Sequence, residues 1–244
     1  MIKIYPDTEA LGLAAAELFA AEARQAVQAR GRFTVALSGG STPRRAYQLL
    51  ANEAFRKLVP WRDTHIFWGD ERCVPGDDPR NNALMARQEL LDHVPVPPEQ
   101  IHPLLCVPSP QEGAAAYEAL LRAFFADGPP RFDLLLLGLG VNGHTASLFP
   151  DTAVLDEQQR WVADVYVAEE GLHRLTLTAA AINQAALVVF LVSGADKAPV
   201  LRKVLKEAQN PRSIPARLIK PVDGGLLWLV DRDAARQLRT RKEY

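Results

Sequence analysis

The chain has 244 residues, of which 48% are hydrophobic, so it can bury a sizeable core and a disordered protein is excluded. Lys and Arg number 28 against 29 Asp and Glu, and the formal net charge is -1. This balance gives no whole-protein field that favours nucleic acid or a membrane surface, so any anion site must come from a local cluster of residues.

The first half of the chain alternates helical patterns with short β-rich runs. Leu11, Ala15 and Phe19 fall on one face of the first helical segment, with Asp7 as its N-cap and Gly31 as its stop. The predicted elements are helices over 7–31, 44–50, 82–91 and 112–125, strands over 33–37 and 65–68, and a short strand over 102–106.

The second half repeats this alternation. Strands are predicted over 132–137, 161–167, 174–177, 187–192 and 226–230, and helices over 179–184, 195–208 and 232–239. Short strands that are apolar throughout, in alternation with helices, indicate a parallel sheet covered on both faces. We therefore expect one α/β domain over 1–244, with its ligand beyond the carboxyl ends of the strands.

Glycines and hydroxyl side chains follow the first predicted strand, in the order Ser38, Gly39, Gly40, Ser41 and Thr42. Glycines let a backbone approach a ligand closely, and a helix start offers free N–H groups and a positive dipole end. Both features suit a phosphate monoester. Taken alone, an ordinary strand-to-helix turn explains the same residues equally well, and no GxxxxGK[ST] loop is present.

Three consecutive charged residues, Asp70, Glu71 and Arg72, follow the strand over 65–68. Such runs are commonly solvated turns, but here an apolar strand delivers them to the ligand edge of the sheet. Asp70 or Glu71 is suited to orient a base or to accept hydrogen bonds from sugar hydroxyls, and Arg72 to hold an anion or a polarised carbonyl. Cys73 comes next, and an activated thiol there is an alternative that no other feature requires.

A glycine-rich turn follows the strand over 132–137. Gly138, Gly140 and Gly143 match GxGxxG, but Pro150 interrupts the helix that a dinucleotide fingerprint should open. His144 comes directly after the turn. A lone histidine is usually structural, but imidazole titrates near neutral pH, so at a strand end this one is a candidate general base.

Three cations complete the candidate site. Arg174 begins a late strand, Lys197 follows another, and Arg80 lies in a loop. Each alone is commonly a solvated surface charge. Together with the Ser38–Thr42 loop, Arg174 and Lys197 are predicted to clamp one phosphate, and Arg80 is a further ligand candidate.

Other classes of site have little support in the sequence. Cys73 and Cys106 are too few for a disulfide scaffold, and no cysteines or histidines stand at zinc spacing. The N-terminal residues lack the apolar region of a secretion signal, and the longest apolar run, about 185–192, is too short to span a bilayer. We expect a cytoplasmic protein with no metal and no cofactor.

These segments, in this order, resemble the sugar-phosphate family that contains 6-phosphogluconolactonase and glucosamine-6-phosphate deaminase. The matching stretches are 36–43, 68–72, 138–150, 174–178 and 197–198, which span most of the chain. The resemblance implies a Rossmann-like three-layer α/β/α sandwich with a mostly parallel sheet. It also implies a catalytic His144 beside Asp70, Glu71 and Arg72, and a phosphate held by the Ser38–Thr42 loop, Arg174 and Lys197.

Two positions separate the activities within this family. Where the family usually carries Asp, two residues before the histidine, this chain has Asn142, which we place among the substrate-binding residues and which supplies no negative charge. The deaminases carry Asn-Glu-Pro after the histidine, whereas here Phe149 precedes Pro150 and cannot transfer a proton. A lactone needs only attack by water, so the resemblance implies hydrolysis of 6-phosphoglucono-1,5-lactone in the oxidative pentose phosphate pathway.

Three alternatives stay open at this point. They are a deaminase or aldose–ketose isomerase of the same fold, a dinucleotide-binding oxidoreductase, and a sugar-phosphate-binding regulator without catalysis, for which Asn142 is the main argument. For the lactonase, the deaminase or isomerase, and the regulator, the expected partner is a small phosphorylated sugar or lactone. We expect no nucleic acid or membrane partner, and a monomer or weak homodimer.

Overall fold

A computed structural model describes residues 1–126, 128–208 and 210–238, which contain two β-sheets. In the larger sheet every pair of neighbouring strands is parallel. Its order is β1 (Ile2–Tyr5), β9 (Gly225–Asp231), β8 (Leu187–Val192), β5 (Leu134–Leu137), β2 (Phe33–Leu37) and β3 (Thr64–Trp68). Every residue of β2 and β5 is buried, as expected for strands covered on both faces.

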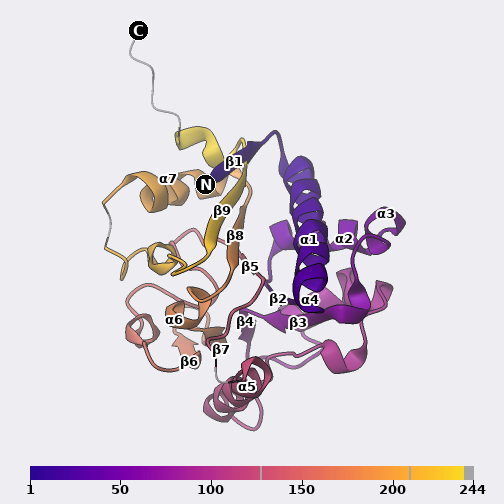
Figure 1. The fold of residues 1–244 in the computed structure, drawn as a ribbon. Helices are drawn as coiled ribbons and strands as arrows, with labels where there is room; N and C mark the ends of the chain where they lie inside the picture. The colour runs from indigo at the N-terminus through magenta and orange to yellow at the C-terminus, as the bar shows by residue number, and fades with distance from the viewer. Residues whose placement is uncertain (127, 209, 239–244) are drawn as a thin grey trace.

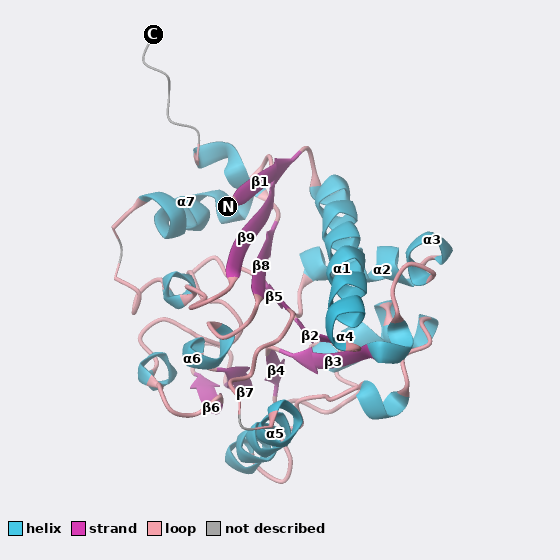
Figure 2. Ribbon diagram, in the orientation of Figure 1, coloured by secondary structure: helices cyan, strands magenta, loops and turns pink. Residues whose placement is uncertain are grey.

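Helices cover both faces of this sheet, which confirms the three-layer α/β/α class. In Figures 1 and 2, α1 (Thr8–Arg30), α2 (Ser41–Ala51) and α4 (Asn82–Glu89) lie on one side and α7 (Ala198–Lys206) lies on the other. The remaining helices are α3 (Glu53–Arg56), α5 (Pro110–Phe125) and α6 (Ala179–Ile182).

The ends of α1 are those predicted. The Asp7 carboxylate accepts a hydrogen bond from the Ala10 N–H at 2.8 Å, and Gly31 closes the helix in the left-handed region with a φ of 72°.

A smaller antiparallel sheet contains β4 (Asp70–Arg72), β7 (Leu172–Leu177) and β6 (Val162–Val167), in that order. The prediction of a mostly parallel sheet is confirmed, and the strands predicted over 161–167 and 174–177 lie outside the parallel sheet, in this antiparallel one. These two strands form a hairpin whose outer face is partly solvated, since Tyr166 is exposed. The charged segment 70–72, which the sequence placed just past a strand, pairs with this hairpin, so that Asp70 lies opposite Thr176 and Arg72 opposite Arg174.

Several predicted boundaries differ from the structure. The strand over 102–106 is absent, because Pro103 has no N–H to donate to a ladder, and a single bridge between Ile66 and Ile101 lies just before it. The helix over 195–208 divides into a 3-10 turn, Ala195–Lys197, and α7. The helix over 232–239 is a 3-10 turn, Ala234–Gln237, and its last predicted residue lies outside the described residues. Strand β1 was not predicted.

The two cysteines form a disulfide, with Cα atoms 5.3 Å apart. The sequence did not predict this bond, and it overturns the alternative of an activated thiol at Cys73, because a disulfide sulfur has no thiolate form. The bond joins the end of β4 to the connector that precedes α5, across 33 positions of the sequence.

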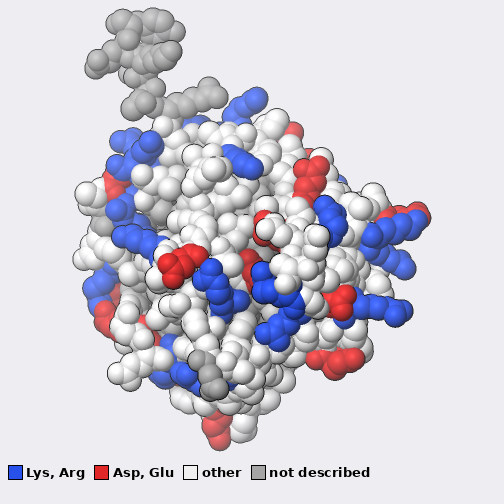
Figure 3. All heavy atoms as spheres, in the orientation of Figure 1, with Lys and Arg blue, Asp and Glu red and all other residues white. Residues whose placement is uncertain are grey.

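The charged side chains are dispersed over the face shown in Figure 3, where Lys and Arg alternate with Asp and Glu and form no continuous basic patch. Among the helices that the structure describes, none combines the length and the apolar character needed to cross a bilayer.

Candidate active site

The carboxyl ends of β2, β3, β5 and β8 surround a cleft with a volume of about 240 Å³. Each of these strands is followed by a segment that contributes to its wall, as expected for an open parallel sheet. The predicted site residues that line it are Ser38, Gly39, Gly40, Ser41, Thr42, Asp70, Arg72, His144, Arg174 and Lys197. Further lining residues include Asn82, Thr145 and Ser193.

One wall is the start of α2. Gly40 has a φ of 108° and no side chain in the described part of the chain caps the helix, so the first-turn N–H groups have no side-chain partner there. The Thr42 and Ser193 hydroxyl oxygens are 2.8 Å apart. The Ser38 hydroxyl is buried without a hydrogen-bond partner among the described residues, although its backbone is fixed by Tyr47. Unpaired donors at a helix N-terminus are suited to a phosphate.

Lys197 adds a positive charge to this wall from the segment after β8. Its Nζ lies 3.4 Å from the exposed carboxylate of Asp196. The turn that precedes it contains Gly194, with a φ of 99°, and is fixed by hydrogen bonds from the Gly194 N–H to the buried carboxylate of Asp231. A lysine on a fixed turn beside free N–H groups completes a cradle for an anion.

His144 is held by Asn142. The Asn142 Oδ1 lies 2.6 Å from the His144 Nδ1 and accepts the His144 backbone N–H at 3.2 Å. Because a backbone N–H only donates, the shared atom is an acceptor, and Nδ1 must carry the ring proton. The His144 Nε2 therefore keeps its lone pair. Asn142 does not line the cleft, so the geometry does not support its predicted place among the substrate-binding residues. It orients His144 instead.

The environment of His144 keeps it neutral. Burial lowers its pKa to about 4, with Asp70 and Glu170 opposing the shift and Arg174 adding to it. Its ring stacks on Phe149 with centroids 4.2 Å apart. Against the other side lies Gly140, where an added Cβ would fall 2.2 Å from the imidazole. The glycine of the GxGxxG pattern thus makes room for the histidine, and no helix follows it.

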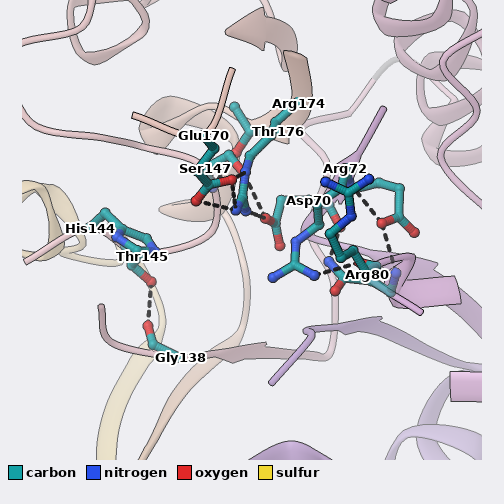
Figure 4. Close-up of polar contacts among 12 residues, drawn as sticks. Asp70, Arg72, Arg80, Gly138, His144, Thr145, Ser147, Glu170, Arg174 and Thr176 are labelled. Carbon is teal, nitrogen blue, oxygen red and sulfur yellow. Dashed lines mark hydrogen bonds and ion pairs between the residues drawn. The ribbon is translucent and has the colours of Figure 1, made fainter. Parts of the chain in front are cut away.

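A polar network lies beside the imidazole (Figure 4). The Ser147 hydroxyl donates to Asp70 Oδ2 at 2.6 Å, and the Arg174 Nη1 is 3.6 Å from the same oxygen. The Arg174 Nη2 and Nε donate to the Glu170 carboxylate at 2.7 and 3.1 Å. The side chains of Asp70 and Arg174 are each 7% exposed, so these two members of the network are buried at the edge of the cleft.

Arg72 lines the cleft and Arg80 does not. The Arg72 Nη1 donates to the Arg80 carbonyl, and its buried Nε has no hydrogen-bond partner among the described residues. Arg80 instead pairs with Asp78 at 2.7 Å and its side chain is 60% exposed. The prediction of Arg80 as a ligand is not supported by this geometry, because the local carboxylate holds its guanidinium outside the cleft.

Glu71 also lies outside the cleft, contrary to its predicted place among the catalytic residues. Its carboxylate accepts the backbone N–H groups of Arg72, Asn82 and Ala83, each at 2.8 Å, and so binds the start of α4. Burial raises its pKa to about 7, and these three hydrogen bonds offset only part of that shift. Side chains alternate across a strand, so the residue between Asp70 and Arg72 faces the other way.

The sequence missed several residues near the cleft. Two of them, Thr145 and Ser147, follow the histidine within the stretch 138–150, so the motif could have indicated them. The Thr145 hydroxyl donates to the Gly138 carbonyl at 2.8 Å. Ser193 follows β8 as Ser38 follows β2. Glu170 lies in a hairpin turn that carries no motif, so only the folded chain reveals it. Among the described residues, no group of three or more His, Cys, Asp or Glu is placed to hold a metal ion.

The cleft thus combines a neutral imidazole with groups suited to bind an anion. The family model for glucosamine-6-phosphate isomerases/6-phosphogluconolactonase matches residues 6–228. The chain belongs to this family. The match covers the smaller sheet, the larger sheet apart from β1 and the end of β9, and every residue of the cleft, so the family and the geometry concern the same part of the molecule.

Individual members of the family are similar over nearly the whole chain. The 6-phosphogluconolactonase of Nostoc sp. is 40% identical over 241 residues, covering 97% of this chain and 98% of its own. That of Synechocystis sp. is 44% identical over 219 residues, covering 88% of each. The solved structure of 6-phosphogluconolactonase from Trypanosoma brucei superposes with a TM-score of 0.85 at 29% identity, covering 98% of both chains.

Proposed function

We propose that this chain hydrolyses 6-phosphoglucono-1,5-lactone to 6-phosphogluconate, the step of the oxidative pentose phosphate pathway that opens the lactone. One observation carries the proposal: the unprotonated Nε2 of His144 and an anion cradle made by α2 and Lys197 share one cleft. The similar proteins of Nostoc and Synechocystis bear the name 6-phosphogluconolactonase. Phe149 stacks on the histidine where a deaminase would need a carboxylate, which favours the lactonase.

The proposed mechanism begins with the phosphate, which binds the first-turn N–H groups of α2 together with Lys197 and Arg174. The His144 Nε2 takes a proton from water as the water oxygen attacks the lactone carbonyl, while Asn142 holds the Nδ1 proton in place. The unpaired Nε–H of Arg72 or a backbone N–H near Gly39 stabilises the oxyanion. When the ring C–O bond breaks, His144 returns the proton to the leaving oxygen.

The test is a coupled assay on freshly made 6-phosphoglucono-1,5-lactone, corrected for spontaneous hydrolysis. Replacing His144→Ala removes the base, and general base catalysis contributes roughly 10²–10⁴-fold, so kcat should fall by about that factor with KM little changed. Turnover by the variant at the wild-type rate would remove His144 from this role. Release of ammonia from glucosamine 6-phosphate by the wild type would favour the deaminase instead.

We also propose that residues 1–244 act as one domain, in the cytoplasm, on a small phosphorylated lactone and without a metal or cofactor. The support is chemical: a lactone is an activated ester, which a neutral imidazole and positive donors can hydrolyse alone. Activity that persists after dialysis against a strong chelator is the expected result, and a loss that Mg²⁺ or Zn²⁺ restores would contradict it.

A further inference from the structure

The guanidinium of Arg174 already binds an anionic side chain, that of Glu170. This guanidinium is bound side-on by the Glu170 carboxylate, with Nη2 to Oε1 at 2.7 Å and Nε to Oε2 at 3.1 Å, and its remaining nitrogen faces Ser147 and Asp70. A planar fork bound by two oxygens is also the arrangement in which arginine binds phosphate. A phosphate cannot take up these donors while Glu170 holds them.

The two partners of this ion pair differ in how firmly they are held. Arg174 lies within β7, paired with Arg72 of β4 and Val165 of β6, and its side chain is 7% exposed. Glu170 lies in the hairpin turn between β6 and β7, and its side chain is 37% exposed. The turn is closed by a hydrogen bond from the Gly171 N–H to the Ala168 carbonyl. Glu170 is therefore the partner that can leave, because solvent can receive its carboxylate.

We propose that Glu170 is a built-in competitor of the substrate phosphate, which occupies Arg174 in the free protein and is displaced when a phosphoryl group binds. The inference rests on the proposed function, because it assigns Arg174 to the phosphate. A phosphoryl group has more charge and more oxygens than one carboxylate, and it also reaches the α2 N-terminus and Lys197, which Glu170 does not contact. These additional contacts allow the phosphoryl group to displace the Glu170 carboxylate from Arg174.

The exchange has two consequences for the reaction. Anions that interact with Arg174 alone are rejected, because a tethered carboxylate has a high effective concentration at that site. Release of the phosphorylated product is assisted, because Glu170 returns to the guanidinium as the phosphate leaves. The positive charge of Arg80 also attracts the Glu170 carboxylate, which adds to the rise in the pKa of Arg80 that Asp78 mainly causes.

The test measures the dissociation constant of inorganic phosphate by titration calorimetry at pH 7, using the whole chain and the variants Glu170→Gln and Glu170→Ala. Removing the competitor should tighten phosphate binding by roughly three- to tenfold, the size of effect expected for a charged contact at a half-exposed site. In the lactone assay, KM and the inhibition constant of 6-phosphogluconate should fall together by a similar factor.

The matched control is Glu169→Gln, which removes the same charge from the same turn at an exposed residue with no ion pair among those described. It should leave phosphate binding unchanged. Unchanged or weaker binding in the Glu170 variants, with thermal midpoints near the wild type, would overturn the proposal, as would an equal gain in Glu169→Gln. Phosphate binding requires no turnover, so a chain that shows this pattern without hydrolysing lactone would refute the function and keep the inference.

Discussion

At the scale of single residues, the chemistry of this cleft depends on which nitrogen of His144 carries a proton. Asn142 fixes the proton on Nδ1 through an acceptor oxygen, and burial keeps the ring neutral with a pKa of about 4. A neutral side chain in that place orients the imidazole without making it more basic. The histidine is consequently available as a base over the whole physiological pH range.

Replacing Asn142→Asp should change the pH profile rather than the fold. A carboxylate 2.6 Å from Nδ1 favours the imidazolium, so the pKa of His144 should rise by one unit or more, on the order of the shifts seen for charged neighbours. A general base acts when deprotonated, so the acid limb of kcat/KM, expected near pH 4 in the wild type, should move to higher pH. Rates on the phosphorylated lactone from pH 4 to 8 provide the measurement.

The control for this prediction is Asn142→Ala, which removes the orienting acceptor without adding charge. It should lower kcat and leave the acid limb where it is. An acid limb that Asn142→Asp does not move would show that the carboxylate and the imidazole are uncoupled, and that another group sets the pH dependence.

At the scale of elements, β4 and α4 form one unit through Glu71. Its carboxylate binds the N–H groups of Asn82 and Ala83 at the start of α4, and Asn82 in turn lines the cleft and donates to the Asp70 carbonyl at 3.0 Å. The position of Asn82 also explains why residue 39 is a glycine, because an added Cβ there would fall 1.9 Å from the Asn82 Oδ1. Glu71 thus acts on the site by positioning a helix.

Replacing Glu71→Gln tests this positioning role. Glutamine has one acceptor oxygen for three N–H groups, so at least one buried donor loses its partner, at a cost of about 1–3 kcal/mol in the free energy of unfolding. Urea denaturation provides this measurement. If the variant keeps wild-type stability but its kcat falls strongly, Glu71 has a catalytic role and the positioning role is wrong.

The same variant carries a pH signature. Because the pKa of Glu71 is raised from 4.5 to about 7 in the folded chain, the folded state binds more protons than the unfolded state between these values. This group's contribution to stability is therefore complete below pH 4.5 and is lost as the pH rises through 7. The difference in unfolding free energy between the wild type and Glu71→Gln should shrink over that range, and a difference that grows would contradict the assignment.

At the scale of the whole molecule, the site exists where two sheets meet. The segments after the parallel strands contribute His144 and the residues that we propose to bind phosphate, and the antiparallel sheet contributes Asp70, Arg72 and Arg174 from β4 and β7. The Cys73–Cys106 disulfide connects the end of β4 to the chain before α5, which packs on β6 and β7. Covalent closure of this loop therefore supports the smaller sheet.

Reducing this disulfide should destabilise the chain without abolishing the site. For a loop spanning 33 positions, the chain-entropy model gives roughly 3–4 kcal/mol. Urea unfolding with and without dithiothreitol measures the difference, and the double variant Cys73→Ser with Cys106→Ser should reproduce the reduced value. Equal unfolding free energies in both conditions would show that the bond adds no constraint to the unfolded chain.

Local patterns in the sequence were sufficient for every strand of the parallel sheet except β1. Strands such as β5 and β8 are apolar at every position, and α1 has its cap residues at both ends, so each is recognisable from neighbours along the chain. The smaller sheet was missed because β4 has three residues, all charged, and its strand character comes from pairing with β7, about a hundred residues away.

The sequence by itself determined the class of fold, the cluster of polar segments at the carboxyl ends of the strands, and the histidine that we propose as the base, because these depend on periodicity and on residue type. Only the tertiary structure decided the direction of each side chain. Neighbouring Asp70 and Glu71 face opposite ways, Asn142 binds the imidazole, and Glu170 reaches Arg174 from a turn without a motif. These side-chain directions depend on packing and strand pairing between segments that are distant in the sequence. Burial and charge at each position are therefore set by neighbours in space, which the local sequence does not specify.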